Sequence, residues 1–266
     1  MSDIYEQAAQ NFLGLASTQR LEILFNLLEK PFTPTALAKK IGATKQEVHR
    51  NFQRLEDHNL IEKNPDGRYG LTTFGETICT QVPSLLFLSQ NKEYFEEHNF
   101  GEIPYKFLMR CGQLINGKHI KGVTKVLEQW KSIYKNSNEY IYEILSEVPL
   151  DLIEPIVKKI KKGVRFTYIF SESAVVPKGR KAILKKLGFY ELVEQGLVKR
   201  KMFKNVQTVL VLNEKEACIL FPTKDGESDL SEMFYSNDPM FHEWCLDYFR
   251  YCWYGSDVFV ESKLKE

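Results

Sequence analysis

Four polar residues between positions 46 and 53 have the chemistry and the spacing needed to read base pairs. At a rotation of about 100° per residue they share one face of a helix: Gln46, His49, Arg50 and Gln53. Arginine and glutamine can each form paired hydrogen bonds with purine edges, and the major groove of DNA admits a helix. The residues predict a base-reading face; an ordinary solvated helix face is the alternative.

Basic residues around this face favour contacts with phosphates. Lys45 stands at the expected start of the helix and Arg54 on its flank, where both can hold the DNA backbone. Positions 39–54 contain the acidic Glu47 and these basic residues: Lys39, Lys40, Lys45, Arg50 and Arg54. Because the formal net charge of the chain is only +1, we expect phosphate attraction from this local patch and not from a long-range field.

Two helices are expected ahead of the base-reading helix. The first covers residues 19–28 and has an apolar stripe at helical spacing: Leu21, Leu24, Phe25 and Leu28. The second is short and covers residues 34–41, with Thr33 as its N-cap, Pro34 in its first position and Gly42 at its end.

The third helix is expected over residues 45–58, after a tight turn at Gly42 and Ala43. Thr44 is its expected N-cap. Its apolar residues fall at i, i+4 and i+7: Val48, Phe52 and Leu55. A short helix, a turn that contains glycine and a longer helix are typical of a helix-turn-helix.

A β-hairpin is expected directly after the third helix. Residues 60–63 and 68–71 form its strands, and the turn 64–67 has the sequence NPDG. Such a hairpin is a wing, and its tip carries Lys63 and Arg68, which suit a minor groove or a phosphate. The same two side chains are equally suited to keep a hairpin soluble.

These segments resemble the ArsR-like winged-helix regulators of archaea and bacteria. The likeness covers roughly residues 10–80 and rests on STQRLEIL (17–24), TALAKKIG (35–42), VHRNFQRL (48–55), NLI (59–61) and YGLT (69–72). It implies a winged helix-turn-helix that binds double-stranded DNA, and it does not imply an effector. Metal-sensing members carry cysteine or histidine ligands in these helices; here His49 and His58 have no neighbouring thiol, so we expect no metal site.

The remainder of the chain consists of a helical segment and, from about residue 139, a segment in which strands and helices alternate. Residues 82–134 read as helical with interruptions at glycine and proline. Beyond them, strands are expected at 140–145, 164–170 and 198–203, and helices at 150–162 and 181–194. This order predicts an α/β unit with parallel strands. Strands at 208–212 and 217–221 predict an antiparallel hairpin.

The last helix is expected over residues 239–254. Its aromatic residues recur in helical register and predict a core-packing face: Phe241, Trp244, Tyr248, Phe249 and Trp253. The five cysteines form no C-x-x-C pair, so we expect buried thiols and neither disulfides nor zinc.

The second half of the chain resembles the effector-side domain of the methanogenesis regulatory protein family of archaea. More distantly it resembles the α/β domain of the TrmB-type sugar-responsive regulators, which is similar to half of a phospholipase D fold. The likeness covers about residues 120–255 and rests on KGV (162–164), ACILFP (217–222), FYSNDPMF (234–241) and YCW (251–253). It implies a domain for dimerisation and sensing, with no readable ligand.

Catalysis by such a domain would need H-x-K followed by an aspartate, because the histidine is the nucleophile and the lysine stabilises phosphate charge. The triplet at residues 119–121 fits, but Val126 stands where the aspartate should be, and no strand is expected before it. We therefore expect no catalytic residues, no enzyme activity and no cofactor.

Two basic clusters remain in this half. Lys158, Lys159, Lys161 and Lys162 form a charge run that is typical of a solvated helix face. Residues 177–181, with the sequence PKGRK, stand at a possible helix start and could hold an anion there; a plain surface turn is the favoured interpretation.

The sequence as a whole predicts an α+β protein. We expect a winged helix-turn-helix at 1–80, a helical connector at 81–135 and an α/β effector and dimerisation domain, half phospholipase D-like, at 136–266. With no membrane span or signal peptide expected, the interpretation is a cytoplasmic homodimeric transcriptional regulator, archaeal in type, that binds palindromic double-stranded DNA and responds to a small-molecule effector. The alternative is a scaffold subunit that uses the winged helix to dock another protein.

Overall fold

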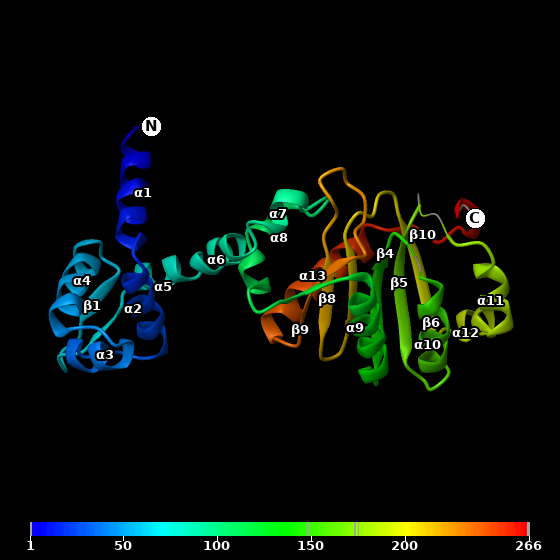
Figure 1. Ribbon diagram of the computed structural model, residues 1–266, viewed down its shortest axis with the longest axis horizontal. Coiled ribbons are helices and arrows are strands. Elements are labelled where there is room, and N and C mark those ends of the chain that lie inside the picture. Colours follow the sequence, from blue (N-terminus) through cyan, green and yellow to red (C-terminus); the bar gives the residue numbers. More distant parts are fainter. Residues whose placement is uncertain (1, 148, 173, 175, 265–266) are drawn as a thin grey trace. The chain divides into compact units, whose positions relative to one another are not determined.

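The computed structural model describes residues 2–147, 149–172, 174 and 176–264 (Figure 1). The chain divides into two compact units, Met1–Pro83 and Ser84–Glu266. Each unit contains helices and its own β-sheet, of two strands in the first and eight in the second. The chain therefore has an α+β fold.

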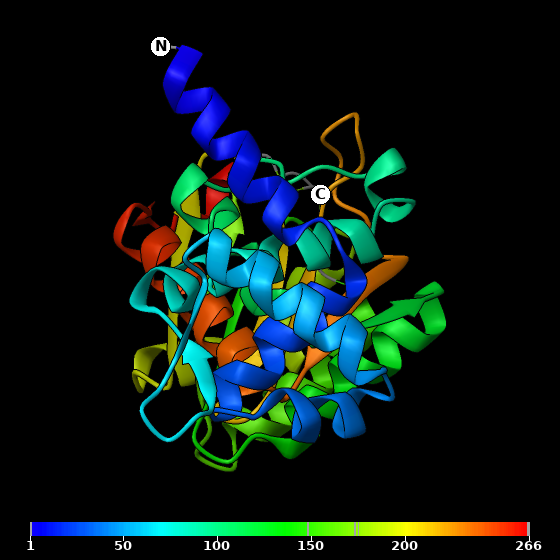
Figure 2. The ribbon, with the colours of Figure 1, turned by 90° about the vertical axis from the view of Figure 1, so that its left-hand side faces the viewer.

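The N-terminal unit consists of helices and a β-hairpin. Its elements are α1 (Ser2–Leu15), α2 (Thr18–Glu29), α3 (Pro34–Ile41), α4 (Lys45–Asp57), β1 (Ile61–Lys63), β2 (Tyr69–Leu71) and α5 (Thr73–Cys79). The strands pair antiparallel, with Glu62 opposite Gly70. The three helices and the hairpin predicted for residues 19–71 are confirmed. Figure 2 faces this unit and shows α1, in dark blue, projecting from the helices that follow it.

Side-chain caps determine where these helices begin. The hydroxyl oxygens of four residues each accept a hydrogen bond from a backbone amide three residues ahead: Ser17, Thr33, Thr44 and Thr72. Glu47 completes a capping box by accepting from the backbone amide of Thr44 at 2.9 Å. Gly42 ends α3 in the left-handed region, at φ 68°, where a residue with a side chain would be strained.

The core of the N-terminal unit lies between α2, α3, α4 and the hairpin. On α4, Val48, Phe52 and Leu55 are buried as predicted. On α2 the predicted stripe is wrong by about one position, because Ile23, Leu24 and Leu27 are buried while Leu28 is 46% exposed. Since α2 is apolar over more than half of its circumference, its partners and not its own pattern decide which residues face inward.

The C-terminal unit is built on a mixed eight-stranded sheet. In sheet order its strands are β10 (Asp257–Val258), β6 (Val198–Phe203), β5 (Arg165–Ser171), β4 (Tyr140–Leu145), β7 (Val209–Asn213), β8 (Ala217–Leu220), β9 (Glu232–Ser236) and β3 (Lys118–Lys121). Strands β4, β5 and β6 run parallel, as predicted. The predicted hairpin of β7 and β8 is antiparallel.

Helices cover both faces of this sheet, each over a separate buried cluster. One face carries α9 (Val123–Asn136), α10 (Leu150–Ile160), α11 (Arg180–Lys186) and α12 (Phe189–Glu194). The other carries α6 (Val82–Gln90), α7 (Tyr94–Glu97), α8 (Tyr105–Leu108), η1 (Cys111–Leu114) and α13 (Pro239–Tyr254). The short helix η2 (Glu261–Lys263) lies near the C-terminus. Along α13, four of the five predicted aromatic residues are fully buried and Trp253 is half-buried, so its core-packing role is confirmed.

Cysteine burial follows the sequence expectation: all five thiols are free and buried. Within the described residues, no helix is both long enough and apolar enough to cross a membrane.

The structure differs from the sequence prediction in several segments of the C-terminal half. Residues 84–135 belong to the C-terminal unit and do not form a separate connector, because β3 pairs with β9 in the large sheet. The single helix expected over 181–194 is two helices, because Gly188 adopts a left-handed conformation at φ 69° between them. Strands β9 and β10 have no counterpart among the predicted elements.

Candidate nucleic-acid interface

Helix α4 presents one continuous polar face to solvent. Six of the predicted site residues lie on it and all are exposed: Lys45, Gln46, His49, Arg50, Gln53 and Arg54. The opposite face of the helix is buried in the core of the N-terminal unit. The exposed face combines paired hydrogen-bonding groups with cations, which is the chemistry of groove recognition.

The orientation of α4 is fixed by contacts on its buried side. The ring of Phe52 packs edge-on against Tyr69 of the hairpin, with 4.7 Å between the ring centroids. Asn51, buried on the same side, donates a side-chain hydrogen bond to Gln19 of α2. Sequence reasoning missed Asn51, although it stands three residues after Val48 and four before Leu55, within the buried stripe.

A buried arginine links α2 to the end of α1. The Arg20 guanidinium donates to the carbonyl oxygens of Gly14 at 2.6 Å and Leu13 at 2.9 Å. Burial, and to a lesser extent the charge of Arg54, lower the pKa of Arg20. These two hydrogen bonds tie the start of α2 to the end of α1.

The hairpin holds its two predicted basic residues at the surface. Lys63 ends β1, and Arg68 precedes β2; both are exposed. The turn between them is closed by a hydrogen bond from the amide of Asn64 to the carbonyl of Arg68 at 2.7 Å. Arg68 also lies 3.5 Å from the Asp66 carboxylate, an exposed pair that contributes little to stability and leaves the guanidinium free to exchange partners.

The polar face of α4 retains its positive charge. Within the described part of the chain, no carboxylate lies within 4.0 Å of the charged groups of Lys45, Arg50 or Arg54. The side chain of Glu47, the acidic residue in the first turn of α4, is engaged in the capping box with Thr44. Hydrogen bonds from Thr44, chiefly from its backbone amide, lower the pKa of Glu47. Lys40, in contrast, is paired with Glu29 at 2.7 Å.

The N-terminal unit contains two histidines. His49 is exposed on α4, whereas the ring of His58 lies against Gly14 of α1. Over the described residues, the side chains of histidine, cysteine, aspartate and glutamate form no group of three suited to hold a metal ion.

The C-terminal unit contains a pair of histidine–carboxylate contacts that the sequence did not reveal. His119 lies on strand β3, contrary to the helical expectation for residues 82–134, and its ring contacts Glu232 at 2.6 Å. His98 contacts Asp229 at 2.9 Å. Burial lowers the pKa of His119, while hydrogen bonds from His98 and Ser231 outweigh burial and lower the pKa of Asp229. Val126 is fully buried in the core.

Comparison with known proteins gives one family match and several structural ones. The family model described as the HVO_A0261 N-terminal domain matches residues 9–89. No curated protein matches the chain.

Three solved structures illustrate the structural similarity. TrmBL2, described as an archaeal chromatin protein with a novel mode of DNA binding, is 12% identical and has a TM-score of 0.43, over 89% of this chain and 92% of its own. NucT from Helicobacter pylori (13% identity, TM-score 0.42) and the phospholipase D family member Nuc from Salmonella typhimurium (14% identity, TM-score 0.40) each align over 54% of this chain and 98% of theirs. The family match thus concerns the N-terminal unit, which carries the polar face of α4.

Proposed function

We propose that this chain is a sequence-specific regulator of transcription that binds double-stranded DNA through its N-terminal unit. The observation that carries the proposal is the exposed polar face of α4, which follows a tight glycine turn and precedes a hairpin. In this interpretation α3 and α4 form a helix-turn-helix, and β1 and β2 form its wing, in the manner of ArsR-like regulators.

The side chains divide into two roles. Gln46, Arg50 and Gln53 face the base edges, where an arginine pairs with guanine and a glutamine with adenine, and His49 lies among them. Lys45 and Arg54 on α4, with Lys63 and Arg68 on the wing, hold phosphates or the adjacent minor groove. Among the described residues of α4, no large apolar side chain is exposed. A helix that docks in the groove of another protein would expose such side chains, so their absence supports DNA as the partner.

The regulator acts as a homodimer in this proposal. Helix α1 supports this view because one broad face of it is apolar and open: Ile4, Tyr5, Phe12 and Leu13 are each at least 61% exposed. Exposed apolar groups gathered on one face mark interaction sites, and a twofold dimer matches a palindromic operator. Phe12→Glu is expected to shift the mass measured by light scattering from dimer to monomer; an unchanged mass would count against α1 as the interface.

The C-terminal unit serves sensing in this proposal, while dimerisation, expected there from the sequence, is assigned to α1. The sheet of this unit is half phospholipase D-like, and we propose no phosphodiesterase activity for it. His119 supports the last point, since its ring is engaged by Glu232 and the position of the required aspartate is the buried Val126. Hydrolysis of bis(p-nitrophenyl) phosphate that disappears in His119→Ala would overturn this part.

The decisive experiment is selection of bound duplexes from a random DNA pool by the full chain at fixed salt. Arg50→Ala and Gln53→Ala are run in parallel, with Arg165→Ala, an exposed arginine of the C-terminal unit, as the matched control. We expect a palindromic motif that the first two variants lose or relax and the control retains. Weak, salt-sensitive binding without enrichment, unaffected by any variant, would favour the protein-docking alternative instead.

A further inference from the structure

A small hollow lies between helices α9 and α10 of the C-terminal unit. Its volume is about 160 Å³, less than that of sites that enclose a whole small molecule, so it can take one group of a larger ligand. Tyr134 and Pro155 form part of its wall. The other residues that line it make up a lysine cluster: Lys131, Lys135, Lys158, Lys159 and Lys162.

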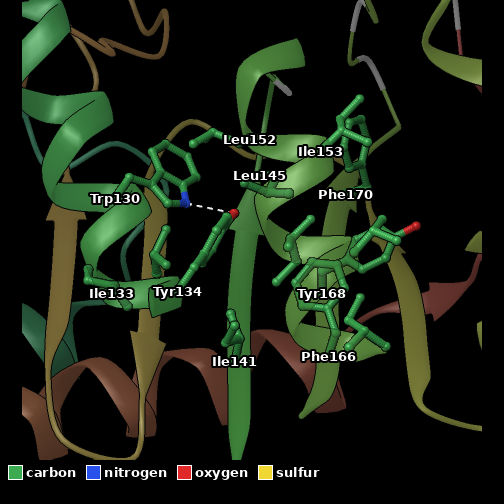
Figure 3. Close-up of a cluster of buried hydrophobic side chains, with 14 of the residues drawn as sticks. Trp130, Ile133, Tyr134, Ile141, Leu145, Leu152, Ile153, Phe166, Tyr168 and Phe170 are labelled. Carbon is green, nitrogen blue, oxygen red and sulfur yellow. Dashed lines mark hydrogen bonds between the residues drawn. The ribbon is translucent and has the colours of Figure 1, made fainter. Parts of the chain in front are cut away.

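The packing of α9 beside α10 brings this lysine cluster together. Figure 3 shows Trp130 and Ile133 of α9 and Leu152 and Ile153 of α10 in one buried cluster. The lysines stand on the solvent side of both helices and of the turn that follows α10, where three of them are exposed and two are half-buried. The charge run at residues 158–162, expected to be an ordinary solvated face, thus lies beside further lysines of α9.

The lysine cluster carries more charge than its neighbours balance. Lys158 lies 2.7 Å from Glu154, and Lys131 lies 4.0 Å from Asp151. Both pairs are exposed and contribute little to stability, so another anion can replace either carboxylate. The remaining members have no carboxylate within 4.0 Å among the residues that the structure describes: Lys135, Lys159 and Lys162.

The spacing of these lysines fits the backbone of a DNA duplex. Lysines four residues apart on one helix are separated by about 6 Å along its axis, and the axes of packed helices lie about 8–10 Å apart. Over about 10 Å, one strand of duplex DNA carries about three phosphates, which matches the three lysines without a carboxylate. Because lysine is a point charge on a flexible stem, such a cluster can hold a backbone without reading bases.

We propose that the lysine cluster binds the sugar–phosphate backbone of double-stranded DNA, as a second DNA contact that is independent of sequence. One phosphate enters the hollow, and the lysines around it hold the neighbouring phosphates. The inference goes beyond the recognition proposed for α4, because it gives the C-terminal unit a share in affinity and none in sequence preference.

The test measures binding of the full chain to a scrambled duplex by fluorescence anisotropy at several salt concentrations. The variant Lys135→Gln/Lys162→Gln should reduce the slope of log K against log salt by about 2, since each neutralised phosphate contributes about 0.9. The matched control is Lys92→Gln/Lys224→Gln. Both control residues are exposed, Lys92 just before α7 and Lys224 with its amide bonded to Glu97 of α7. Equal slopes in the variant and the control would overturn the proposal.

Glu154→Gln should change binding in the opposite direction. It removes the carboxylate that is paired with Lys158, so that the freed ammonium group can hold a phosphate. We expect tighter binding to the scrambled duplex and a slope steeper by about 1. Because a gain in affinity does not arise from misfolding, this variant decides even if Lys135→Gln/Lys162→Gln fails to fold. Unchanged or weaker binding of Glu154→Gln would contradict the proposal.

These outcomes are independent of sequence recognition by α4. Selection from a random pool with Lys135→Gln/Lys162→Gln should yield the same motif as the unaltered protein, whereas Arg50→Ala should lose it. If no protein enriches a motif but the slope still falls by about 2, recognition by α4 fails and the second contact stands.

A small polyanion is the other source of phosphate groups. Sodium tripolyphosphate is therefore titrated into the full chain by isothermal titration calorimetry. If the Lys135→Gln/Lys162→Gln variant loses tripolyphosphate binding while its duplex slope equals that of the control, the lysine cluster serves a small polyanion and the proposal is overturned.

Discussion

The side-chain amide of Asn51 on α4 donates a hydrogen bond to the side-chain oxygen of Gln19 on α2. Asn51 is 5% exposed, so loss of its partner would leave a buried amide unsatisfied. The bond joins the helix that carries the polar face to the helix that packs beneath it. Its removal therefore reports how firmly the orientation of α4 is held.

We expect Asn51→Ala and Gln19→Ala each to lower the free energy of unfolding of the N-terminal unit by about 1 kcal/mol. Hydrogen–deuterium exchange of the slowest amides in α2 and α4 measures the change in the full chain. The double variant should lose less than the sum of the two single variants, because both remove one interaction. Strictly additive losses would show that the two side chains act independently.

Gly75 on α5 lies so close to the hairpin that a side chain does not fit. A Cβ atom placed there would be 1.9 Å from the carbonyl oxygen of Leu60, which is backbone and cannot rotate away. We expect Gly75→Ala to destabilise the N-terminal unit by about 1–3 kcal/mol, the usual cost of overpacking, measured by amide exchange over residues 60–79.

Gly70 provides the matched control for that change. It is also buried, but the nearest atom to an added Cβ is the side-chain nitrogen of Asn64 at 3.5 Å, an ordinary contact. Gly70→Ala should therefore change the exchange rates much less. Equal protection of the amides from exchange in the Gly75→Ala and Gly70→Ala variants would disprove the close approach of Gly75 to Leu60.

Glu143 makes the stability of the C-terminal unit depend on pH. Burial raises the pKa of Glu143 to about 7, above the value of about 4.3 in an unfolded chain. Between these values the unfolded chain has released a proton that the folded unit retains, so stability falls as pH rises from about 4.5 to about 7 and levels off above. The loss is on the order of 3 kcal/mol for this shift.

Glu143→Gln should remove this contribution, so that its unfolding free energy declines less than that of the unaltered protein between pH 5 and pH 8. Urea unfolding followed by tryptophan fluorescence reports the correct unit, since all three tryptophans lie in residues 84–266. Glu128→Gln, on the exposed side of α9, should keep the original pH dependence. Parallel curves for Glu143→Gln and the unaltered protein would contradict the assignment.

The elements of the N-terminal unit could be predicted because their signals are local. Thr33, Thr44 and Gly42 mark helix ends within a few residues of each other, and the caps form as expected. The face of α4 followed from its periodicity alone. The buried face of α2 did not, because which of its many apolar residues turn inward depends on contacts made elsewhere in the chain.

In the C-terminal unit, local sequence patterns do not predict every element or every buried residue. Strand β3 is only four residues long, and its partner β9 lies more than a hundred residues later, so the pairing leaves no trace in a short window. The burial of Arg180 was likewise hidden, because PKGRK has the composition of a surface turn. Only the packing of Phe170 and Glu261 around the guanidinium reveals its buried position.

Lys45 distinguishes phosphate contacts from base contacts on α4. It stands exposed at the first position of the helix, with no ion pair among the described residues, and we expect it to neutralise one phosphate. Lys45→Gln should weaken binding to all duplexes alike and reduce the slope of log K against log salt by about 1. Fluorescence anisotropy with a selected duplex and a scrambled one measures both effects.

Lys185→Gln serves as the control of equal charge in the other unit and should leave the slope unchanged. If Lys45→Gln altered sequence preference while keeping the slope, Lys45 would belong with the base-reading residues and the division of roles along α4 would have to be redrawn.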